Sequence, residues 1–343
     1  MVDSLQELAF ADRSRNALDF SRTALFLLKA QGSLSQAAML AQQGGASSRI
    51  VTSLKAAVPA NLLTDDVGDF GILSAGFVAS LSTSGAFDAV RTGGAIRLPI
   101  SNPAFRASTV ALTGDISPEN TWRPVSTLTV APGQLITAWS TVILVATAEL
   151  LDNAAGAVDL FNNELRRATV AGVDRAFLAE LANGAATVSA TSSVLADISS
   201  AADAMSLDSS ARLILIAPTT NVRHLGLAAL ADGRKVYPEL TVNGGRIGGV
   251  QIIPSDNLPL AGSPADQTGA VLVDASQVAV ADGALQLDTA RNASLQMADA
   301  PSAGAQPAVS LWQTNSRALR VRRRIGYARL RSTAAAVIDG PDW

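Results

Sequence analysis

The chain has 343 residues, of which 48% are apolar and 16% charged, values typical of folded globular proteins. Its net charge of −3 argues against nucleic-acid binding driven by bulk electrostatics, and the lack of cysteine excludes disulfides and thiolate metal sites. No apolar run reaches the roughly 18 to 20 residues that span a bilayer, so we expect no partnership with a membrane.

The basic residues are almost all arginine. Lysine occurs three times, at Lys29, Lys55 and Lys235, so 23 of the 26 basic residues are arginine. Arginine keeps its charge and forms planar, multi-donor hydrogen bonds that suit interfacial pairing. A GC-rich genome would produce the same bias, so both explanations stay open.

Residues 1–60 have the pattern of three short helices separated by glycines. Gly32 is placed to end the first helix, Ser33 to cap the second and Pro59 to end the third. Helices of this number and length form an arm or a small bundle, which is too little for an independent domain.

The character changes after Pro59. From 64 to 90, glycine, serine and aspartate interrupt short apolar patches, and from 94 to 145 five prolines and two β-branched stretches predict extended chain. The polar segment 102–123 between these strands is long for a loop in a compact domain. The simplest geometry is a projecting two-stranded hairpin, which needs another surface because an isolated hairpin is marginal in water.

The clearest helix runs from about Ala157 to Leu181 and would be roughly 37 Å long. Its apolar residues recur at spacings of three and four, which predicts one buried stripe made of Val158, Phe161, Leu165, Ala168, Gly172 and Ala176. Charged residues, among them Asp174, are expected on the remaining surface. A helix of this length is an element on which a domain can be built.

Residues 185–300 read as alternating helices and strands, and the tail after 308 reads as strand. The expected elements are a helix at 194–205 capped by Ser193, a strand at 212–217, a helix at 221–230, and strands at 249–253, 270–273 and 277–281. In the tail, Leu319, Val321, Ile325 and Tyr327 share one face, and Arg320, Arg322 and Arg324 share the other.

The groups that enzymes use are scarce. His224 is the only histidine, and we expect it to be a structural or surface residue. The stretch 244–249 (GGRIGG) lacks the lysine and hydroxyl of a phosphate loop and predicts a turn before a strand. Asp65, Asp66 and Asp69 lack the calcium-loop pattern and predict a solvated turn. We therefore predict no catalytic activity, no cofactor and no metal.

Seven arginines fall within fifteen positions near the C-terminus. They are Arg317, Arg320, Arg322, Arg323, Arg324, Arg329 and Arg331. These residues either contact phosphates of packaged nucleic acid or pair with carboxylates of the same sheet or of neighbouring subunits. Tight alternation with apolar residues favours pairing.

Four motifs, in this order, carry a family resemblance. They are ATAELLDNA (146–154), LRRATVAGVDRAFLAELANG (165–184), the pair LILIAPTTNVRHLGLAALADGRKVYPEL (213–240) and GGRIGGVQIIPSDNLP (244–259), and SRALRVRRRIGYARLRSTAAAVI (316–338). Each is weakly specific alone, but their order and spacing resemble those of the major capsid proteins of tailed bacteriophages, which have the Hong Kong ninety-seven fold. The resemblance covers roughly residues 60–340.

The resemblance implies an α+β fold with a helical N-terminal arm, an extended β-hairpin loop, a peripheral domain with a long spine helix, and an α/β axial domain. The corresponding boundaries are 1–60 for the arm, 61–93 for the lead-in, 94–135 for the extended loop, 136–185 for the peripheral domain with its spine helix, 186–300 for the axial domain and 301–343 for the closing strands.

The resemblance also implies function and partners. It describes a non-enzymatic virion protein that assembles in the bacterial host cytoplasm into hexamers and pentamers of an icosahedral shell. Its partners would be further copies of itself, portal, scaffolding and possible decoration proteins, and double-stranded DNA bound without sequence specificity on the inner face. The residues expected at contacts between subunits are Trp122, Arg123, Arg166, Arg167, Arg320, Arg322 and Arg324.

Two departures from the family pattern carry expectations of their own. Some members join a loop lysine to an asparagine of a neighbour, but residues 94–135 contain no lysine, so we expect a noncovalent shell. Some members lose an N-terminal scaffolding segment to a protease. The first sixty residues are short for such a segment and lightly charged, so we expect an uncut N-terminus.

Two other functions stay open at the level of sequence. An encapsulin-type nanocompartment shell shares the fold and would enclose cargo enzymes instead of DNA. A monomeric α/β binding protein or hydrolase, using a cleft near His224, belongs to a different class. Packaged nucleic acid would separate the first alternative from a virus shell, and a stable species near 35 kDa would favour the second.

Overall fold

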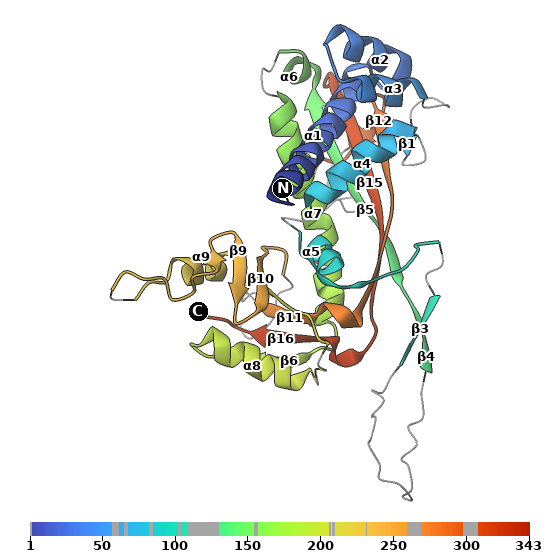
Figure 1. Ribbon diagram of the computed structural model, residues 1–343. Helices are drawn as coiled ribbons and strands as arrows, with labels where there is room; N and C mark the ends of the chain where they lie inside the picture. The colour runs from blue at the N-terminus through green and yellow to red at the C-terminus, as the bar shows by residue number, and fades with distance from the viewer. Residues whose placement is uncertain are drawn as a thin grey trace, which may run out of the picture. The chain divides into compact units, whose positions relative to one another are not determined.

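The computed structural model describes residues 2–56, 62–64, 68–81, 85–101, 104–108, 130–153, 157–205, 207, 210–230, 232–258, 269–297 and 308–343 (Figure 1). The chain divides into two compact units. Unit 1 comprises residues 1–83, 139–172 and 283–324, and unit 2 comprises residues 84–138, 173–282 and 325–343. The predicted division into arm, loop, peripheral and axial domains stays a prediction.

Three helices open unit 1, as the sequence predicts: α1 (Val2–Lys29), α2 (Leu34–Gln43) and α3 (Ser48–Ala56). Gly32 has a φ of 84°, a left-handed conformation that glycine adopts at little cost, and it follows the end of α1. The hydroxyl of Ser33 accepts a hydrogen bond from the backbone of the first turn of α2. The predicted stop and cap are both confirmed.

Two helices after residue 64 were not predicted: α4 (Gly68–Leu81) and α5 (Ala86–Gly93). α4 lies beside α1 in unit 1 (Figure 1). The two backbones come close at Gly76, where an added Cβ would lie 2.4 Å from the Cβ of Asn16. The same glycine that permits this contact weakens the helical signal in the sequence, because glycine disfavours helix interiors.

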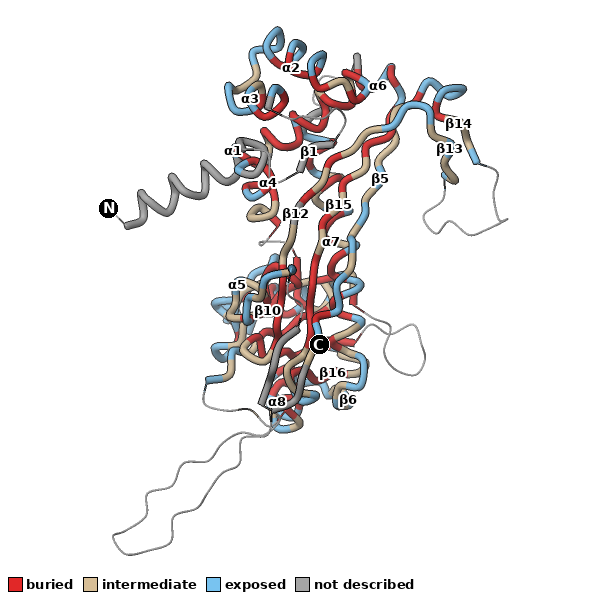
Figure 2. The backbone as a smooth tube through the Cα atoms, turned by 90° about the vertical axis from the view of Figure 1, so that its right-hand side faces the viewer, coloured by how far each residue is buried: buried red, intermediate tan, exposed pale blue. Residues whose placement is uncertain are grey.

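The first sheet has the strand order β1-β12-β15-β5, with β2 pairing in parallel to β12. The strands are β1 (Leu62–Thr64), β2 (Ile96–Arg97), β5 (Ile136–Thr147), β12 (Val278–Ala290) and β15 (Ser316–Arg329). In unit 1, Leu285 and Leu287 of β12 and Leu319 and Val321 of β15 join one hydrophobic core with Phe20 of α1. Figure 2 shows buried residues along β12 and β15, whereas most residues of β5 are exposed or intermediate.

The long predicted helix is α7 (Ala157–Ala182), preceded by the short α6 (Ala148–Asn153). The helix is confirmed, and its predicted buried stripe is confirmed at Phe161 and Leu165 but wrong at Ala168, Gly172 and Ala176, which are exposed. The stripe continues instead through Thr169, Val173, Phe177 and Leu181, with further buried residues beside it at Asn162, Val170, Asp174 and Leu178. Ala168, Gly172 and Ala176 also recur at spacings of three and four, but small residues fill little of a core, so the spacing alone predicted the wrong side of the helix there.

Unit 2 contains a seven-stranded sheet with the order β6-β16-β11-β7-β10-β9-β8. Its strands are β6 (Ala186–Ser189), β7 (Leu213–Ala217), β8 (Leu240–Thr241), β9 (Gly244–Ile247), β10 (Val250–Pro254), β11 (Ala270–Asp274) and β16 (Ala335–Asp339). The predicted helices appear as α8 (Val194–Ala204) and α9 (Thr219–Leu227). β7 and β10 run parallel, whereas β11 runs antiparallel to both of its neighbours, β7 and β16, so this sheet is mixed.

The predicted turn before a strand is confirmed at Gly248 and Gly249, which lead into β10, whereas residues 244–247 form the strand β9. Gly248 and Gly249 have φ values of 56° and 86°, which two-residue hairpin turns of the mirror-image type require. An added Cβ on Gly244 would lie 2.7 Å from the carbonyl oxygen of Ile252. These glycines therefore serve backbone geometry in a hairpin.

Part of the predicted extended loop is described. β3 (Ala104–Ser108) pairs antiparallel with β4 (Val130–Gln134), which forms the base of a hairpin. Residues 109–129 lie outside the described residues. A second small ribbon joins β13 (Ser294–Leu295) and β14 (Val309–Ser310).

A short turn follows α9 in unit 2. An isolated bridge between Ala229 and Lys235 closes it, and Asp232 and Arg234 form an exposed ion pair at its tip. The hydrogen bond from the Arg234 side chain lowers the pKa of the Asp232 carboxyl. An added Cβ on Gly233 would meet no atom within 4 Å.

The stability of unit 2 should decrease at alkaline pH because the phenol of Tyr327 is buried. Burial, with a smaller contribution from the Glu180 charge, raises the pKa of its phenol above 10.0. The unfolded chain thus loses this proton at a lower pH than the folded chain, so the stabilisation is complete below about pH 10 and declines as the pH rises further. We expect the urea midpoint to fall between pH 9.5 and 11, and Tyr327→Phe to reduce that slope. An unchanged slope in the variant would contradict this assignment.

The α+β class is confirmed, with separate helices and two extended sheets. No helix within the described ranges combines the length and the apolar character needed to cross a membrane.

Candidate surface for contacts between subunits

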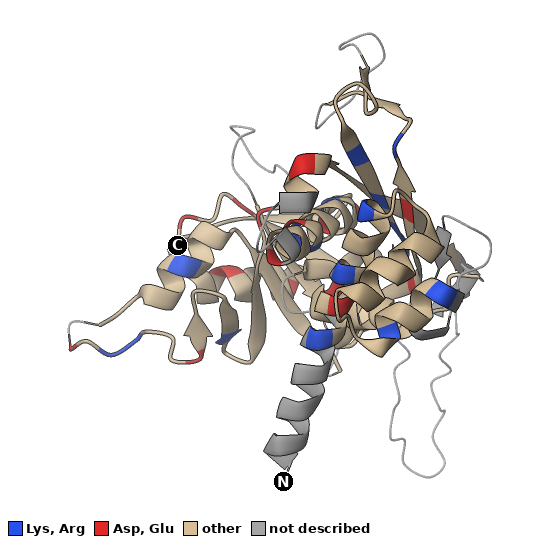
Figure 3. Ribbon diagram, turned by 90° about the horizontal axis from the view of Figure 1, so that it is seen from above, with Lys and Arg blue, Asp and Glu red and all other residues tan. Residues whose placement is uncertain are grey.

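Six of the seven arginines clustered near the C-terminus, here called the arginine ladder, lie on strand β15 of the first sheet. Arg320, Arg322 and Arg324 are partly exposed, while Leu319 and Val321 are buried on the opposite face. Strand alternation places them so, because successive side chains point to opposite faces. Figure 3 shows basic residues as isolated bands along otherwise uncharged segments.

Neighbouring strands supply partners for two of these arginines. The guanidinium of Arg320 forms an ion pair with the carboxylate of Asp288 on β12. Arg322 donates a hydrogen bond of 2.8 Å to the side-chain oxygen of Gln286, two residues earlier on β12. The predicted pairing with a carboxylate of the same sheet is therefore observed for Arg320, whereas Arg322 bonds to an amide oxygen.

Trp139 of β5 lies beside the other end of the ladder. The guanidinium carbons of Arg322 and Arg324 lie 5.3 and 6.0 Å from the centre of its ring, within the range of cation–π attraction. The indole is still 45% exposed. Two arginines and a tryptophan thus form a surface that is both cationic and apolar.

Two arginines of the ladder do not belong to the face that carries Arg320, Arg322 and Arg324. Arg323 is only 1% exposed and lies among the buried residues of β15, although the sequence grouped it with the other six arginines of the ladder. Strand geometry determines this, since residue 323 shares the parity of Leu319 and Val321. Arg317 donates hydrogen bonds to the carbonyls of Leu28 and Lys29, the C-terminal end of α1.

The other predicted contact residues are dispersed. Arg166 donates a hydrogen bond of 2.8 Å to the carbonyl of Ser80 and is partly buried in unit 1. Arg167 is exposed on α7 and pairs with Glu164 at 3.0 Å. Trp122 and Arg123 lie outside the described residues. The structure therefore brings together only Arg320, Arg322 and Arg324, and their role between subunits stays a prediction.

Because Arg320 and Arg322 are partly exposed, replacing either should lower the free energy of unfolding only slightly. Arg320→Ala should lower the free energy of unfolding by less than about 1 kcal/mol, because exposed ion pairs are screened by water. Arg322→Ala should cost more, about 1 to 2 kcal/mol, since it loses the bond to Gln286 and the packing on Trp139. Urea denaturation of both variants measures this, and a larger cost for Arg320→Ala would contradict the described contacts.

A buried carboxylate in unit 2 was missed by sequence reasoning. Asp174 was expected on the exposed side of α7, yet it is 1% exposed. Its two oxygens accept hydrogen bonds of 2.8 and 2.9 Å from the backbone N–H groups of Ala86 and Phe87, in the first turn of α5. A carboxylate at this position also meets the positive end of the helix dipole.

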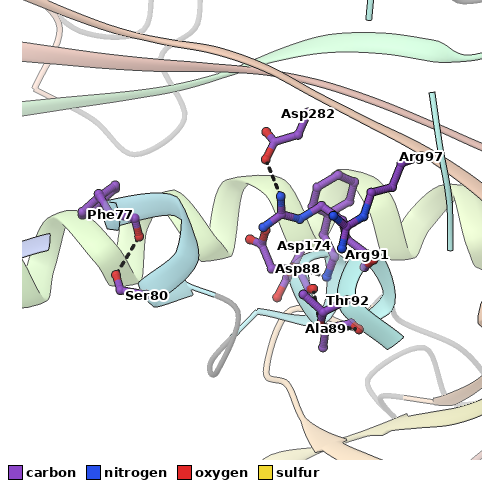
Figure 4. Close-up of polar contacts among 10 residues, drawn as sticks. Phe77, Ser80, Asp88, Ala89, Arg91, Thr92, Arg97, Asp174 and Asp282 are labelled. Carbon is purple, nitrogen blue, oxygen red and sulfur yellow. Dashed lines mark hydrogen bonds and ion pairs between the residues drawn. The ribbon is translucent and has the colours of Figure 1, made fainter. Parts of the chain in front are cut away.

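Further charges surround the same helix. Arg91 of α5 bridges Asp88, at 3.1 Å, and Asp282, at 3.0 Å (Figure 4). Arg97 donates a longer hydrogen bond to the carbonyl of Arg91. The helix signal around α5 is weak, so the sequence offered no means to group these residues. Their pairing is structural, because each described charge here has a partner.

Groups for chemistry are sparse in the described part of the chain. His224 is exposed on α9, as expected of a surface residue. Among the described residues, no three His, Cys, Asp or Glu side chains are grouped so as to hold a metal ion. Asp65 and Asp66 lie outside those ranges.

Comparison with known proteins identifies a capsid relative. No family model matches the chain. Over 136 residues it is 34% identical to the capsid polyprotein of Pseudomonas phage PAJU2, covering 38% of this chain and 20% of the polyprotein. The chain thus spans about a fifth of the length of that relative.

Several solved structures resemble part of this chain. A chain from Mycobacterium phage Ogopogo is 19% identical with a TM-score of 0.48, covering 73% of this chain and 91% of that one. A chain from Gordonia phage Cozz is 17% identical with a TM-score of 0.46, covering 73% and 85%. The capsid of a native GTA particle is 13% identical with a TM-score of 0.43, covering 76% and 90%. Over the matched residues, this chain is therefore similar to a phage capsid polyprotein, which agrees with the resemblance seen in the sequence.

Proposed function

We propose that this chain is a capsid shell protein, a structural component of a phage virion with no catalytic role. The observation that carries the proposal is the 34% identity to a phage capsid polyprotein over 136 residues. The same order of motifs led to the same family from the sequence. Assembly would take place in the cytoplasm of the bacterial host.

The finer features of the proposal concern the assembled particle. The chain forms hexamers and pentamers of an icosahedral shell, and this shell encloses double-stranded DNA. Contacts between copies are noncovalent, since residues 94–135 hold no lysine for a covalent link to a neighbour. Portal, scaffolding and decoration proteins are its further partners.

Negative-stain microscopy of the purified protein, together with size-exclusion chromatography, tests this proposal. We expect closed particles, and a single monomer band after denaturing electrophoresis of those particles. A stable species near the monomer mass of 35.2 kDa at all protein concentrations would overturn the shell function. A ladder of covalent oligomers would overturn only the noncovalent contacts.

A further inference from the structure

The C-terminal end of α7 carries an exposed Asn-Gly pair. The sequence contains two such pairs, Asn183–Gly184 and Asn243–Gly244, and both asparagines are exposed. An asparagine before glycine can lose its side-chain amide, because glycine has no side chain to hinder attack of its backbone nitrogen on the asparagine side chain. The surroundings of each pair decide whether this chemistry can proceed.

The backbone nitrogen of Gly184 is free to react. Gly184 has a φ of 68° and follows the end of α7, a position whose N–H commonly bonds back to a carbonyl of the last helical turn. The N–H of Asn183 makes such a bond, to the carbonyl of Ala179. Among the hydrogen bonds of the described residues, none uses the N–H of Gly184. This nitrogen therefore has no hydrogen bond to break before it attacks.

A guanidinium lies on the oxygen that gains charge in this reaction. When Gly184 loses its N–H proton, the negative charge spreads through the peptide group onto the carbonyl oxygen of Asn183. Arg329 of β15 donates a hydrogen bond from its Nη2 atom to that same oxygen. A charged donor held at the atom where charge develops stabilises the transition state. Arg329 is therefore placed to accelerate the attack.

The second Asn-Gly pair lacks both features. Gly244 is a paired residue of β9, opposite Thr241 of β8, and its carbonyl accepts a hydrogen bond of 2.6 Å from the Thr241 hydroxyl. Ring closure requires the backbone of the pair to rotate, and strand pairing opposes that rotation. In the described part of the chain, no arginine donates to the carbonyl of Asn243. Asn243 thus provides an internal reference with the same local sequence.

We infer that Asn183 deamidates spontaneously through a cyclic imide, and that Arg329 assists the attack. The nitrogen of Gly184 bonds to the Cγ atom of Asn183, and the bond between Cγ and Nδ2 breaks. The proton lost from the nitrogen leaves with the side-chain amide as ammonia. Water then opens the ring. Cleavage at the Cγ carbonyl gives aspartate, and cleavage at the main-chain carbonyl gives isoaspartate, which is joined to Gly184 through its side chain.

Either product changes the junction between α7 and β6. Both carry a new carboxylate at residue 183, and in isoaspartate it is formed from the carbonyl that Arg329 already contacts. Isoaspartate also adds one carbon to the backbone shortly before Ala186, where β6 begins to pair with β16. The reaction needs one copy of the chain and water. It therefore accumulates with the age of the protein and does not depend on the proposed shell function.

Mass spectrometry of peptides tests the site and the role of Arg329. The protein is incubated at mildly alkaline pH and digested, and conversion at Asn183 and Asn243 is measured in the same sample. We expect Asn183 to convert at least about threefold faster than Asn243. Arg329→Gln should slow conversion at Asn183 about tenfold, as expected for one charge-assisted hydrogen bond, and leave Asn243 unchanged. Arg329→Lys keeps the charge and should recover part of the rate.

Arg331→Gln is the matched control, because it removes the same charge two residues further along, from a side chain with no described bond to Asn183. It should leave the rate at Asn183 unchanged, and circular dichroism checks that the variants keep the native fold. In urea, where the contact is lost, the unmodified protein and Arg329→Gln should convert Asn183 equally fast.

The two parts of the inference fail in different ways. A native protein that converts Asn183 no faster than Asn243 would overturn the modification site. Equal native rates at Asn183 in the unmodified protein and Arg329→Gln would overturn the role of Arg329. The same conclusion would follow if Arg331→Gln slowed the reaction as much, or if the difference between the unmodified protein and Arg329→Gln persisted in urea.

Discussion

Replacing Asp174 with alanine should lower the free energy of unfolding by about 3 to 4 kcal/mol. The substitution leaves the backbone N–H groups of Ala86 and Phe87 buried without acceptors, and each such loss costs about 1 to 3 kcal/mol. It also removes a negative charge from the N-terminal end of α5, a helix that has no side-chain cap of its own at Gly85. Urea denaturation of the disassembled protein, followed by circular dichroism, measures the loss.

A graded series tests how the loss grows with the number of acceptor oxygens removed. Asp174→Asn keeps one acceptor oxygen and should cost about half as much as Asp174→Ala. Asp203→Ala is the matched control, since Asp203 is exposed on α8 in the same unit, and it should cost less than about 0.5 kcal/mol. Equal losses for Asp174→Ala and Asp203→Ala would show that the carboxylate does not hold α5.

The second large effect concerns Asp197, a buried residue of α8. One of its oxygens accepts hydrogen bonds from the N–H and the hydroxyl of Thr191, at 2.8 and 2.6 Å. The other accepts a bond of 2.7 Å from the indole nitrogen of Trp343. Asp197→Ala should lower the free energy of unfolding by about 2 kcal/mol, because it leaves the buried indole N–H of Trp343 without its acceptor and removes both bonds to the more exposed Thr191.

A double-mutant cycle tests whether Trp343 acts through that carboxylate. Trp343→Phe removes one donor, retains an aromatic ring and should cost about 1 to 2 kcal/mol alone. In the Asp197→Ala background the same change should cost about 1 kcal/mol less, since the bond is already lost. Strict additivity in urea denaturation would mean that the indole packs at this position without contributing through its hydrogen bond.

Local signals in the sequence were enough to predict the elements that have strong periodicity or clear ends. The helix that became α7, the Ser33 cap and the strand ending at Pro218 all depend on neighbouring residues, and all are observed. α4 and α5 were missed because Gly71 and Gly76 interrupt the first and because the second has only eight residues. Glycine lowers the helical signal even where close packing requires it.

The functional surface was predicted only in part, for a related reason. Alternation placed Arg320, Arg322 and Arg324 on one face of a strand, which is a local property. The role of Asp174 depends on Ala86, which is 88 residues away in the sequence, so no local pattern could indicate it. The position of β5 at the edge of the described sheet also needs the strand order, because its sequence has no charge or proline that would mark an edge.

The turn after α9 has a practical consequence for engineering. Asp232 and Arg234 are exposed at its tip, a single bridge between Ala229 and Lys235 closes its base, and Gly233 has open space around it. Foreign epitopes inserted between Asp232 and Gly233 would break the bonds within this turn, such as that from the Gly233 N–H to the Leu230 carbonyl, but no bond of the seven-stranded sheet, whereas an insertion in the tight glycine hairpin before β10 would disturb its register. A peptide intended for display in many copies would therefore be grafted at the first position and never at the second.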